Sequence, residues 1–146
     1  MNAPVPPQAH PQPFPIPIPF AHHLGLQFYG ATEDSAEVRV WLQAPHLNGW
    51  GVAHGGLLLT MMDISMALAA RSGHQEGPGV ATIELKTSFL RPAEGELRGI
   101  GTVLQRTVSM AFCEGRVLNA QGELCAHATA TFKFLGGVTA PARPPR

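Results

Sequence analysis

One histidine, two glycines and one aspartate mark the segment of this chain that is best equipped for chemistry. His54, Gly55 and Gly56 precede a long apolar stretch, and Asp63 is the only carboxylate between His54 and Ala70. Burying an acid among apolar side chains costs free energy unless the acid is paired or used. Glycines at the start of a helix leave backbone N–H groups that can bind a developing negative charge. One segment therefore offers both an acid and an oxyanion site.

The spacing of these residues has a consequence for assembly. Gly55 and Asp63 are eight residues apart, which corresponds to a rise of roughly 12 Å along a helix. One small carbonyl group cannot contact both. The donor and the acid of a single site are therefore expected to come from two chains, which predicts a homodimer with its sites at the interface.

The same residues also have structural explanations. Asp63 can hydrogen-bond neighbouring backbone or cap a nearby helix, and His54 can shape the loop or pack at an interface. Met61, Met62 and Met66 favour core packing, although flexible thioethers would also suit the lining of an acyl pocket.

Composition restricts the class of protein. The chain has 146 residues, a formal net charge of zero and 14% charged residues, which predicts one domain and no nucleic-acid surface. The longest apolar run, around Leu57 to Met66, is too short and too polar to span a membrane, and the N-terminus lacks a signal-peptide pattern. Cys113 and Cys125 fit no metal spacing and indicate reduced core residues, although a disulfide stays open at this point. We therefore expect a cytoplasmic protein with no metal and no membrane partner.

Two tails flank the expected domain, which covers residues 20–135. Residues 1–19 are rich in proline, which favours extended or polyproline II backbone. This pattern predicts a flexible arm or, alternatively, a proline-rich ligand for another domain. Residues 136–146 are expected to form a second flexible tail.

The residues between the tails predict two strands, one long helix and four more strands. Strands joined by short turns imply an antiparallel sheet, and a helix that is apolar on nearly all sides must be wrapped or sandwiched. A curved antiparallel sheet folded around one helix satisfies both requirements and belongs to the α+β class. The predicted elements are a short helix at 20–24, strands at 26–31 and 36–44, the long helix at 54–71, and strands at 80–90, 96–107, 110–119 and 124–135.

This order of elements, together with the motif, resembles the hotdog-fold thioesterases, and among them the PaaI-type acyl-CoA thioesterases. The resemblance covers roughly Phe20 to Phe134 and is carried by the HGG helix opening, by Asp63 at its spacing and by Asn48 upstream. It implies a hotdog fold, an acyl-CoA substrate, and subunits that pair into homodimers and often again into homotetramers. Further support comes from His23–Leu26, Pro78–Val80 and Phe89–Ala93.

The resemblance assigns roles to individual residues. Gly55 corresponds to the glycine whose backbone N–H polarises the thioester carbonyl, with Gly56 beside it as a substrate-binding candidate. Asp63 corresponds to the acid that acts as base or nucleophile. Asn48 corresponds to the asparagine that orients the carbonyl or a water molecule, although Asn48-Gly49 is also a common turn pair. His54 remains a catalytic candidate beside its structural alternative.

A helper hydroxyl on the strand after the helix is harder to place. The resemblance implies such a hydroxyl at a set spacing from either end of this strand. The spacing counted back from Arg91-Pro92 gives Thr82, whereas the spacing counted forward from Pro78-Gly79 gives Ala81, which has no hydroxyl. We adopt Thr82, because the end of the strand fixes the register better than a loop does. Thr82 as an ordinary β-branched strand residue is the alternative.

The sequence thus predicts an acyl-CoA thioesterase. Coenzyme A is part of the substrate, so no separate cofactor is expected, and Arg91 and Arg106 are candidates to bind its phosphates. Two alternatives remain: a non-catalytic module that binds or senses acyl-CoA, and a hotdog dehydratase or hydratase. The presence of Asp63 favours an enzyme over a sensor.

Overall fold

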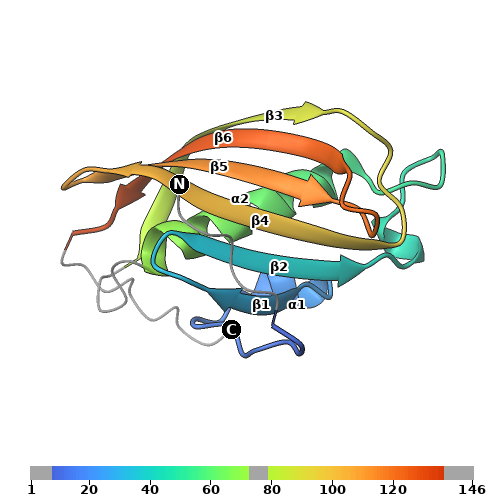
Figure 1. The fold of residues 1–146 in the computed structure, drawn as a ribbon, viewed down its shortest axis with the longest axis horizontal. Coiled ribbons are helices and arrows are strands. Elements are labelled where there is room, and N and C mark those ends of the chain that lie inside the picture. The colour runs from blue at the N-terminus through green and yellow to red at the C-terminus, as the bar shows by residue number, and fades with distance from the viewer. Residues whose placement is uncertain (1–7, 73–78, 137–146) are drawn as a thin grey trace, which may run out of the picture.

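A computed structural model of the chain describes residues 8–72 and 79–136 as an antiparallel sheet curved around one long helix (Figure 1). The predicted α+β class and the predicted order of elements are confirmed. The first seven residues of the predicted arm and residues 137–146 of the predicted tail lie outside the described residues. The elements are α1 (Pro19–His23), β1 (Gln27–Ala31), β2 (Ser35–Trp41), the 3-10 helix η1 (Ala44–His46), α2 (Gly55–Ser72), β3 (Val80–Phe89), β4 (Glu96–Arg106), β5 (Met110–Leu118) and β6 (Leu124–Phe134).

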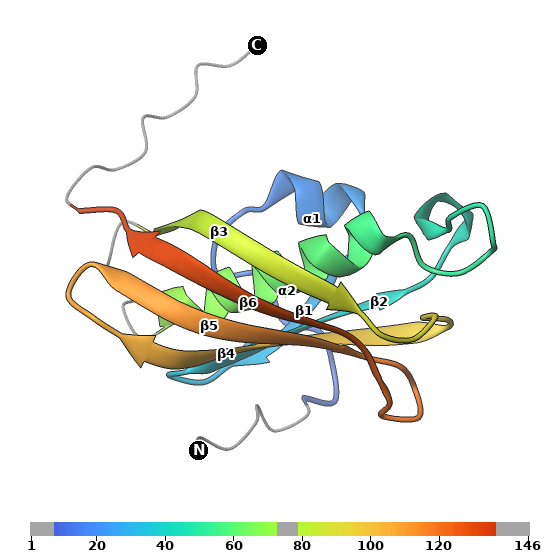
Figure 2. The ribbon, with the colours of Figure 1, turned by 90° about the horizontal axis from the view of Figure 1, so that it is seen from above.

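The six strands form a single sheet in the order β1-β2-β4-β5-β6-β3. Every neighbouring pair is antiparallel. Figure 2 shows α2 with the sheet on one side and α1 on the other. The strands β1 and β3 are therefore the two edges of the sheet, and β3 follows α2 directly in the chain.

The core lies between α2 and the concave face of the sheet. Alternate residues of β5, such as Ala111 and Val117, are fully buried, as the period of a strand with one covered face requires. Met61, Met62 and Met66 are also fully buried, so the methionine cluster is core. Within residues 8–72 and 79–136, no helix combines the length and apolarity needed to cross a bilayer.

Glycines let the sheet approach α2 closely. A Cβ atom at Gly101 on β4 would lie well under 3.0 Å from backbone atoms of Ser65 and Met66. Two further glycines, Gly99 and Gly115, face side chains of the same helix. The absence of side chains at these positions allows the sheet to curve around α2 and fixes the distance between them.

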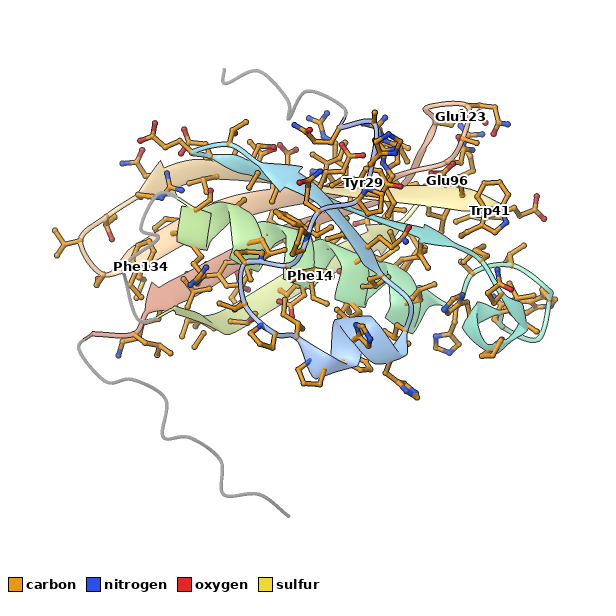
Figure 3. All side chains as sticks on the ribbon, turned by 90° about the horizontal axis from the view of Figure 1, so that it is seen from below. Phe14, Tyr29, Trp41, Glu96, Glu123 and Phe134 are labelled. Atoms are coloured by element: carbon orange, nitrogen blue, oxygen red, sulfur yellow. The ribbon has the colours of Figure 1, made fainter. Side chains whose placement is uncertain are left out.

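The N-terminal segment is packed on the domain from residue 8 onward, which revises the expectation of a flexible arm at 1–19. The backbone N–H of Gln12 donates to the Phe28 carbonyl at 2.7 Å in an isolated bridge to β1. The ring of Phe14, labelled in Figure 3, stacks on Phe28 with centroids 5.6 Å apart. Pro19 opens α1, a position at which proline loses no helical hydrogen bond. Phenylalanine and isoleucine between the prolines supply the apolar surface that holds the segment in place.

Both cysteines are buried free thiols, as the core interpretation predicted. Burial raises the pKa of the Cys113 thiol to about 12, although the positive charge of Arg106 opposes the shift. The Cys125 thiol also has a raised pKa because of its burial. Neither thiol is therefore in a state to act as a nucleophile at neutral pH.

Candidate active site

The first turn of α2 contains one backbone donor that the protein itself does not use. His54 precedes the helix, and its carbonyl accepts a hydrogen bond from the Leu57 N–H at 2.9 Å. Its ring Nδ1 accepts the Gly56 N–H at 2.8 Å, as a side chain at the N-cap position does. Among the described residues, no group accepts a hydrogen bond from the N–H of Gly55. The predicted pair of free donors is therefore reduced to one, and Gly56 is not available as a donor to substrate.

The same contacts decide what His54 does. Its ring stabilises the start of the helix, and an acceptor Nδ1 leaves the proton of the neutral ring on Nε2. This geometry favours the structural alternative for His54 over a catalytic one.

Gly55 borders a hollow of about 350 Å³ between the start of α2 and the segment that joins β3 to β4. Asn48, Phe89 and Arg91 also line it. A Cβ atom at Gly55 would lie 3.2 Å from the Phe89 ring, so that glycine leaves just enough room for the ring. No acidic residue lies in the first turn of α2, so no negative side chain there opposes the positive end of the helix dipole. The hollow can therefore hold a polarised carbonyl oxygen.

Asn48 serves the turn and faces the hollow at once. Its Oδ1 accepts the N–H groups of Trp50 at 2.9 Å and Val52 at 3.3 Å. Its Nδ2 donates to no group in the described parts of the chain, and the residue lines the hollow beside Gly55. The side-chain oxygen thus builds the turn, and the side-chain nitrogen remains a second donor.

Asp63 and Thr82 lie next to each other on α2 and β3. The Thr82 hydroxyl donates to Asp63 Oδ1 at 2.8 Å. The pairing of β3 with β6 advances by one residue between Thr82 and Glu84, so that Ile83 forms a bulge. Bulges commonly occur beside active sites, because they redirect a side chain. The structure thus places Thr82, and not Ala81, against the acid.

Within one chain, the donor and the acid remain apart. Gly55 and Asp63 lie on one regular helix, and eight residues correspond to roughly 12 Å along its axis. Asp63 is half-buried and Thr82 is exposed. Both lie at the β3 edge of the sheet, where Ile83 and Phe89 are 54% and 56% exposed. Within the described chain, the N–H of Gly55 and the carboxylate of Asp63 are therefore too far apart to contact one small carbonyl group.

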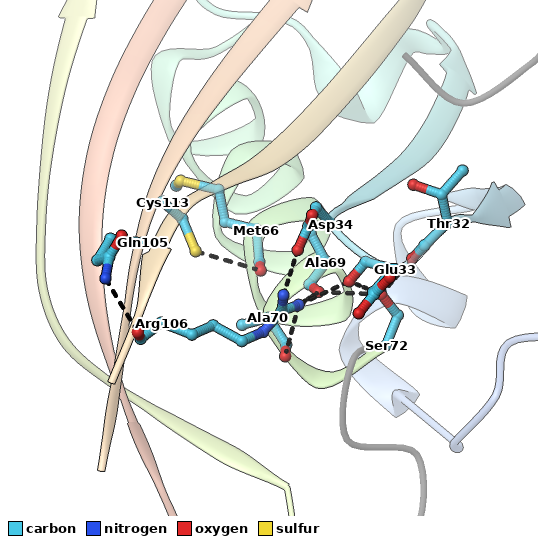
Figure 4. A network of polar contacts seen from close by, with 10 residues as sticks. All are labelled: Thr32, Glu33, Asp34, Met66, Ala69, Ala70, Ser72, Gln105, Arg106 and Cys113. Atoms are coloured by element: carbon cyan, nitrogen blue, oxygen red, sulfur yellow. Dashed lines mark hydrogen bonds and ion pairs between the residues drawn. The ribbon is translucent and has the colours of Figure 1, made fainter. Parts of the chain in front are cut away.

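The two candidate arginines lie in different surroundings. Arg91 lines the hollow beside Gly55, and its guanidinium forms an ion pair with the exposed Glu123 at 3.2 Å. Arg106 lies at the opposite end of α2, where its guanidinium pairs with Asp34 and donates to the Ala69 carbonyl at 2.9 Å (Figure 4). These bonds cap the last turn of the helix. The assignment of Arg106 to coenzyme A phosphates is therefore corrected to a structural role, and Arg91 remains a candidate.

Phe89 is a residue of this region that the sequence did not single out for function. Its ring covers Gly55 and lines the hollow. Phe89 directly precedes Leu90-Arg91-Pro92 at the end of β3. It belongs to the motif that supported the resemblance, and this position was the signal in the sequence that could have indicated a functional role.

Known proteins resemble this chain in sequence and in fold. The family model of the thioesterase superfamily matches residues 51–126. A Halobacterium salinarum protein, provisionally named an esterase, is 36% identical over 90 residues, which cover 55% of this chain and 60% of that protein. A conserved protein of Pseudomonas aeruginosa has a solved structure with a TM-score of 0.78 and 31% identity, covering 83% of this chain and 97% of that one. The Escherichia coli PaaI protein, from the phenylacetic acid degradation operon, gives a TM-score of 0.75 and 25% identity over 82% of this chain and 86% of its own.

Proposed function

Because this chain belongs to the thioesterase superfamily and resembles PaaI in fold, we propose that it hydrolyses acyl-coenzyme A thioesters to a free acid and coenzyme A. The observation that carries the proposal is the hydrogen bond from Thr82 to Asp63. It holds a carboxylate in a fixed orientation at the open edge of the sheet, where a substrate can reach it.

The proposed chemistry divides the work between a donor end and an acid end. The thioester oxygen accepts the Gly55 N–H, assisted by the Asn48 amide and the helix dipole, so that charge developing on this oxygen is stabilised. Asp63 either takes a proton from the attacking water or attacks the carbonyl carbon itself. In the first route the C–S bond breaks after water attacks, and the leaving thiolate takes up the proton that Asp63 removed from that water. In the second route the C–S bond breaks as Asp63 forms an acyl anhydride. A water molecule then hydrolyses this anhydride to the free acid, which restores the Asp63 carboxylate, and the proton released from the water goes to the thiolate of coenzyme A. Arg91 lies beside the hollow and would pair with a phosphate of coenzyme A.

We further propose that the site is completed by a second copy of the chain. Roughly 12 Å along α2 separates Gly55 from Asp63, so each thioester would use Gly55 of one subunit and Asp63 of the other. The open edge of β3, with its exposed Ile83, is the surface that a second β3 would cover. Two such dimers would pair to form a homotetramer.

A panel of short, medium, long and aromatic acyl-CoAs tests the activity, with free thiol release as the readout. We expect Asp63→Asn to lower kcat by roughly 10²-fold or more, since the base or nucleophile is lost while the shape is kept. Glu33→Gln is the matched control, because it removes one negative charge from an exposed side chain at the other end of α2. No turnover of any substrate, or full activity of Asp63→Asn, would show that the catalytic assignment is wrong.

The shared site has a sharper test at Gly55. Proline at the first helical position keeps the helix but lacks the N–H, so Gly55→Pro removes the proposed donor and, like alanine, adds a Cβ atom near Phe89. Gly55→Ala is the control, because it brings a Cβ atom near Phe89 and keeps the N–H. We expect Gly55→Pro and Asp63→Asn each to be inactive. Subunits of the two variants that re-associate at random should regain about a quarter of wild-type activity, since half the dimers would contain one intact site of two. A mixture that stays inactive while heterodimers form would exclude the shared site.

A further inference from the structure

His46 is a buried histidine whose ring bonds are both made to backbone. It ends the 3-10 helix η1 and is 8% exposed. Its Nδ1 accepts the Gln43 N–H at 2.9 Å, and its Nε2 lies 2.7 Å from the Leu24 carbonyl. A carbonyl can only accept and a backbone N–H can only donate, so the ring is neutral with its proton on Nε2. Both bonds require this one tautomer.

The ring of His46 ties the loop before α2 to α1. Leu24 is the C-cap residue of α1, and its carbonyl is one of the groups that a helix end leaves unpaired. Gln43 lies three residues before His46, so the ring also closes the turn of η1. The position of the His46 backbone is thus fixed from two sides.

The backbone of His46 then holds the start of α2. Its carbonyl accepts the His54 N–H at 2.8 Å. His54 in turn accepts the Gly56 N–H through its ring, at 2.8 Å. Gly55 lies between these two bonded residues, so the direction of its free N–H is set by the bonds on either side. A continuous path of hydrogen bonds runs from Leu24 through His46 and His54 to Gly56.

We infer that His46 is a positioning residue, which fixes the orientation of the Gly55 N–H through the backbone of His54. The inference rests on the proposed role of Gly55 as the oxyanion donor. His46 borders a different hollow, of about 400 Å³, between α1 and the start of α2. It acts on the reaction through the geometry of the donor and not through contact with the thioester.

This role predicts a specific pattern of kinetic effects. A donor aimed away from the developing oxyanion weakens the transition state more than the bound substrate. His46→Ala should therefore lower kcat roughly ten- to hundredfold and leave KM within about twofold. Gln at this position can still donate to Leu24, whereas Asn can still accept from Gln43. Each of these variants should recover part of the lost kcat, because each restores one of the two ring bonds.

The experiment measures kcat and KM of wild type, His46→Ala, His46→Gln and His46→Asn, together with amide hydrogen exchange. His23→Ala is the matched control, since His23 is an exposed histidine one residue before Leu24. In His46→Ala, the amides of His54 and Gly56 should exchange faster while β4 and β5 keep their protection. Should His46→Ala fail to fold, the Gln and Asn variants carry the same comparison against wild type.

The outcomes separate this inference from the proposed function. A wild-type protein without turnover on the whole panel would refute the thioesterase proposal, and hydrogen exchange at His54 and Gly56 would then decide the role of His46 alone. Wild-type kcat in His46→Ala, or unchanged exchange at these two amides, would overturn the positioning role. Faster exchange throughout the chain would also overturn it, because that result indicates a general loss of stability.

Discussion

Gly101→Ala is the substitution that we expect to destabilise the fold most clearly. Gly101 lies on β4 directly beneath the backbone of α2, and a Cβ atom there would lie well under 3.0 Å from Ser65 and Met66. The opposing atoms are backbone, so no side chain can rotate away. To reach ordinary contact at 3.4–4 Å, helix and strand must separate by on the order of 1 Å.

The expected cost follows from comparison with two neighbouring glycines. Overpacking a core costs typically about 1–3 kcal/mol, and a clash with backbone belongs at the upper end or beyond. A Cβ at Gly99 or Gly115 would meet its nearest neighbour, the Cβ of Met61 or Met62, at 3.2 or 3.1 Å. At these distances the neighbouring atoms must move by only a few tenths of an ångström, and alanine also restricts the unfolded chain by about 0.5–1 kcal/mol relative to glycine. We therefore expect Gly99→Ala and Gly115→Ala within about 1 kcal/mol of wild type, and Gly101→Ala about 3 kcal/mol less stable.

Urea denaturation and thermal melting of the three variants measure this difference. A loss of about 3 kcal/mol corresponds to a lower Tm by roughly 10 °C for a domain of this size. Asp63 lies two residues before Ser65, so the same displacement should weaken its bond to Thr82 and lower kcat. Equal stability of Gly101→Ala and the other two variants would show that α2 does not approach the sheet this closely.

Three further predictions follow from contacts away from the proposed oxyanion site. Thr82→Val removes the hydroxyl that binds Asp63 and should lower kcat about tenfold with little change in Tm; an unchanged kcat would leave Thr82 as an ordinary strand residue. Burial raises the pKa of Glu37, but hydrogen bonds and charges from Arg98 and Arg39 outweigh it, so that its pKa is lowered from 4.5. The ion pairs of the Glu37 carboxylate with Arg98 and Arg39 therefore stabilise the fold fully above pH 4.5, and this stabilisation is lost as the pH falls further and Glu37 is protonated. The Tm of wild type should exceed that of Glu37→Gln at neutral pH, and the difference should shrink in acid. The Cys113 thiol, with its pKa raised to about 12, should resist thiol reagents at pH 8 until the protein is denatured; rapid labelling of native protein would contradict this.

The elements could be predicted because their residues repeat with the periods of helix and strand. The predicted long helix at 54–71 corresponds to α2 at Gly55–Ser72, and the four strands after it lie within two residues of their predicted bounds. The alternation of apolar residues along β5 and the almost wholly apolar sequence of α2 are local signals, because each can be recognised within a short stretch of sequence. The order of strands in the sheet left no such signal, because pairing is decided between distant segments.

The uncertainty over the helper hydroxyl has a physical origin. Counting from the two ends of β3 gave Ala81 and Thr82, one residue apart. The bulge at Ile83 interrupts the regular alternation of side chains along β3, so the residue of this strand that faces Asp63 does not follow from a simple period of two. A bulge has no reliable signature in a single sequence, so only the structure could decide between the two positions.

The roles of Arg106 and His54 could not be predicted for a different reason. Arg106 pairs with Asp34, which lies 72 positions earlier in the chain, and such a pair leaves no periodic pattern. His54 caps its own helix through Nδ1, a role that serine, threonine, aspartate or asparagine usually fills. Residue type left a catalytic and a structural role open for His54 and made Arg106 a candidate for phosphate binding. The contacts that decide both roles are created only by the fold.

The two edges of the sheet differ in a way that bears on the proposed assembly. An exposed edge strand tends to pair with another chain, and proteins usually cover or shorten such edges. The β1 edge is covered where Gln12 bonds to Phe28, and the proline-rich sequence of this segment offers few further N–H groups for pairing. The β3 edge has ten residues, pairs only with β6 within the described residues, and carries Thr82 beside Asp63. An edge that is left open at the position of the acid is what a site completed by a second subunit requires, and the complementation of Gly55→Pro with Asp63→Asn tests that requirement directly.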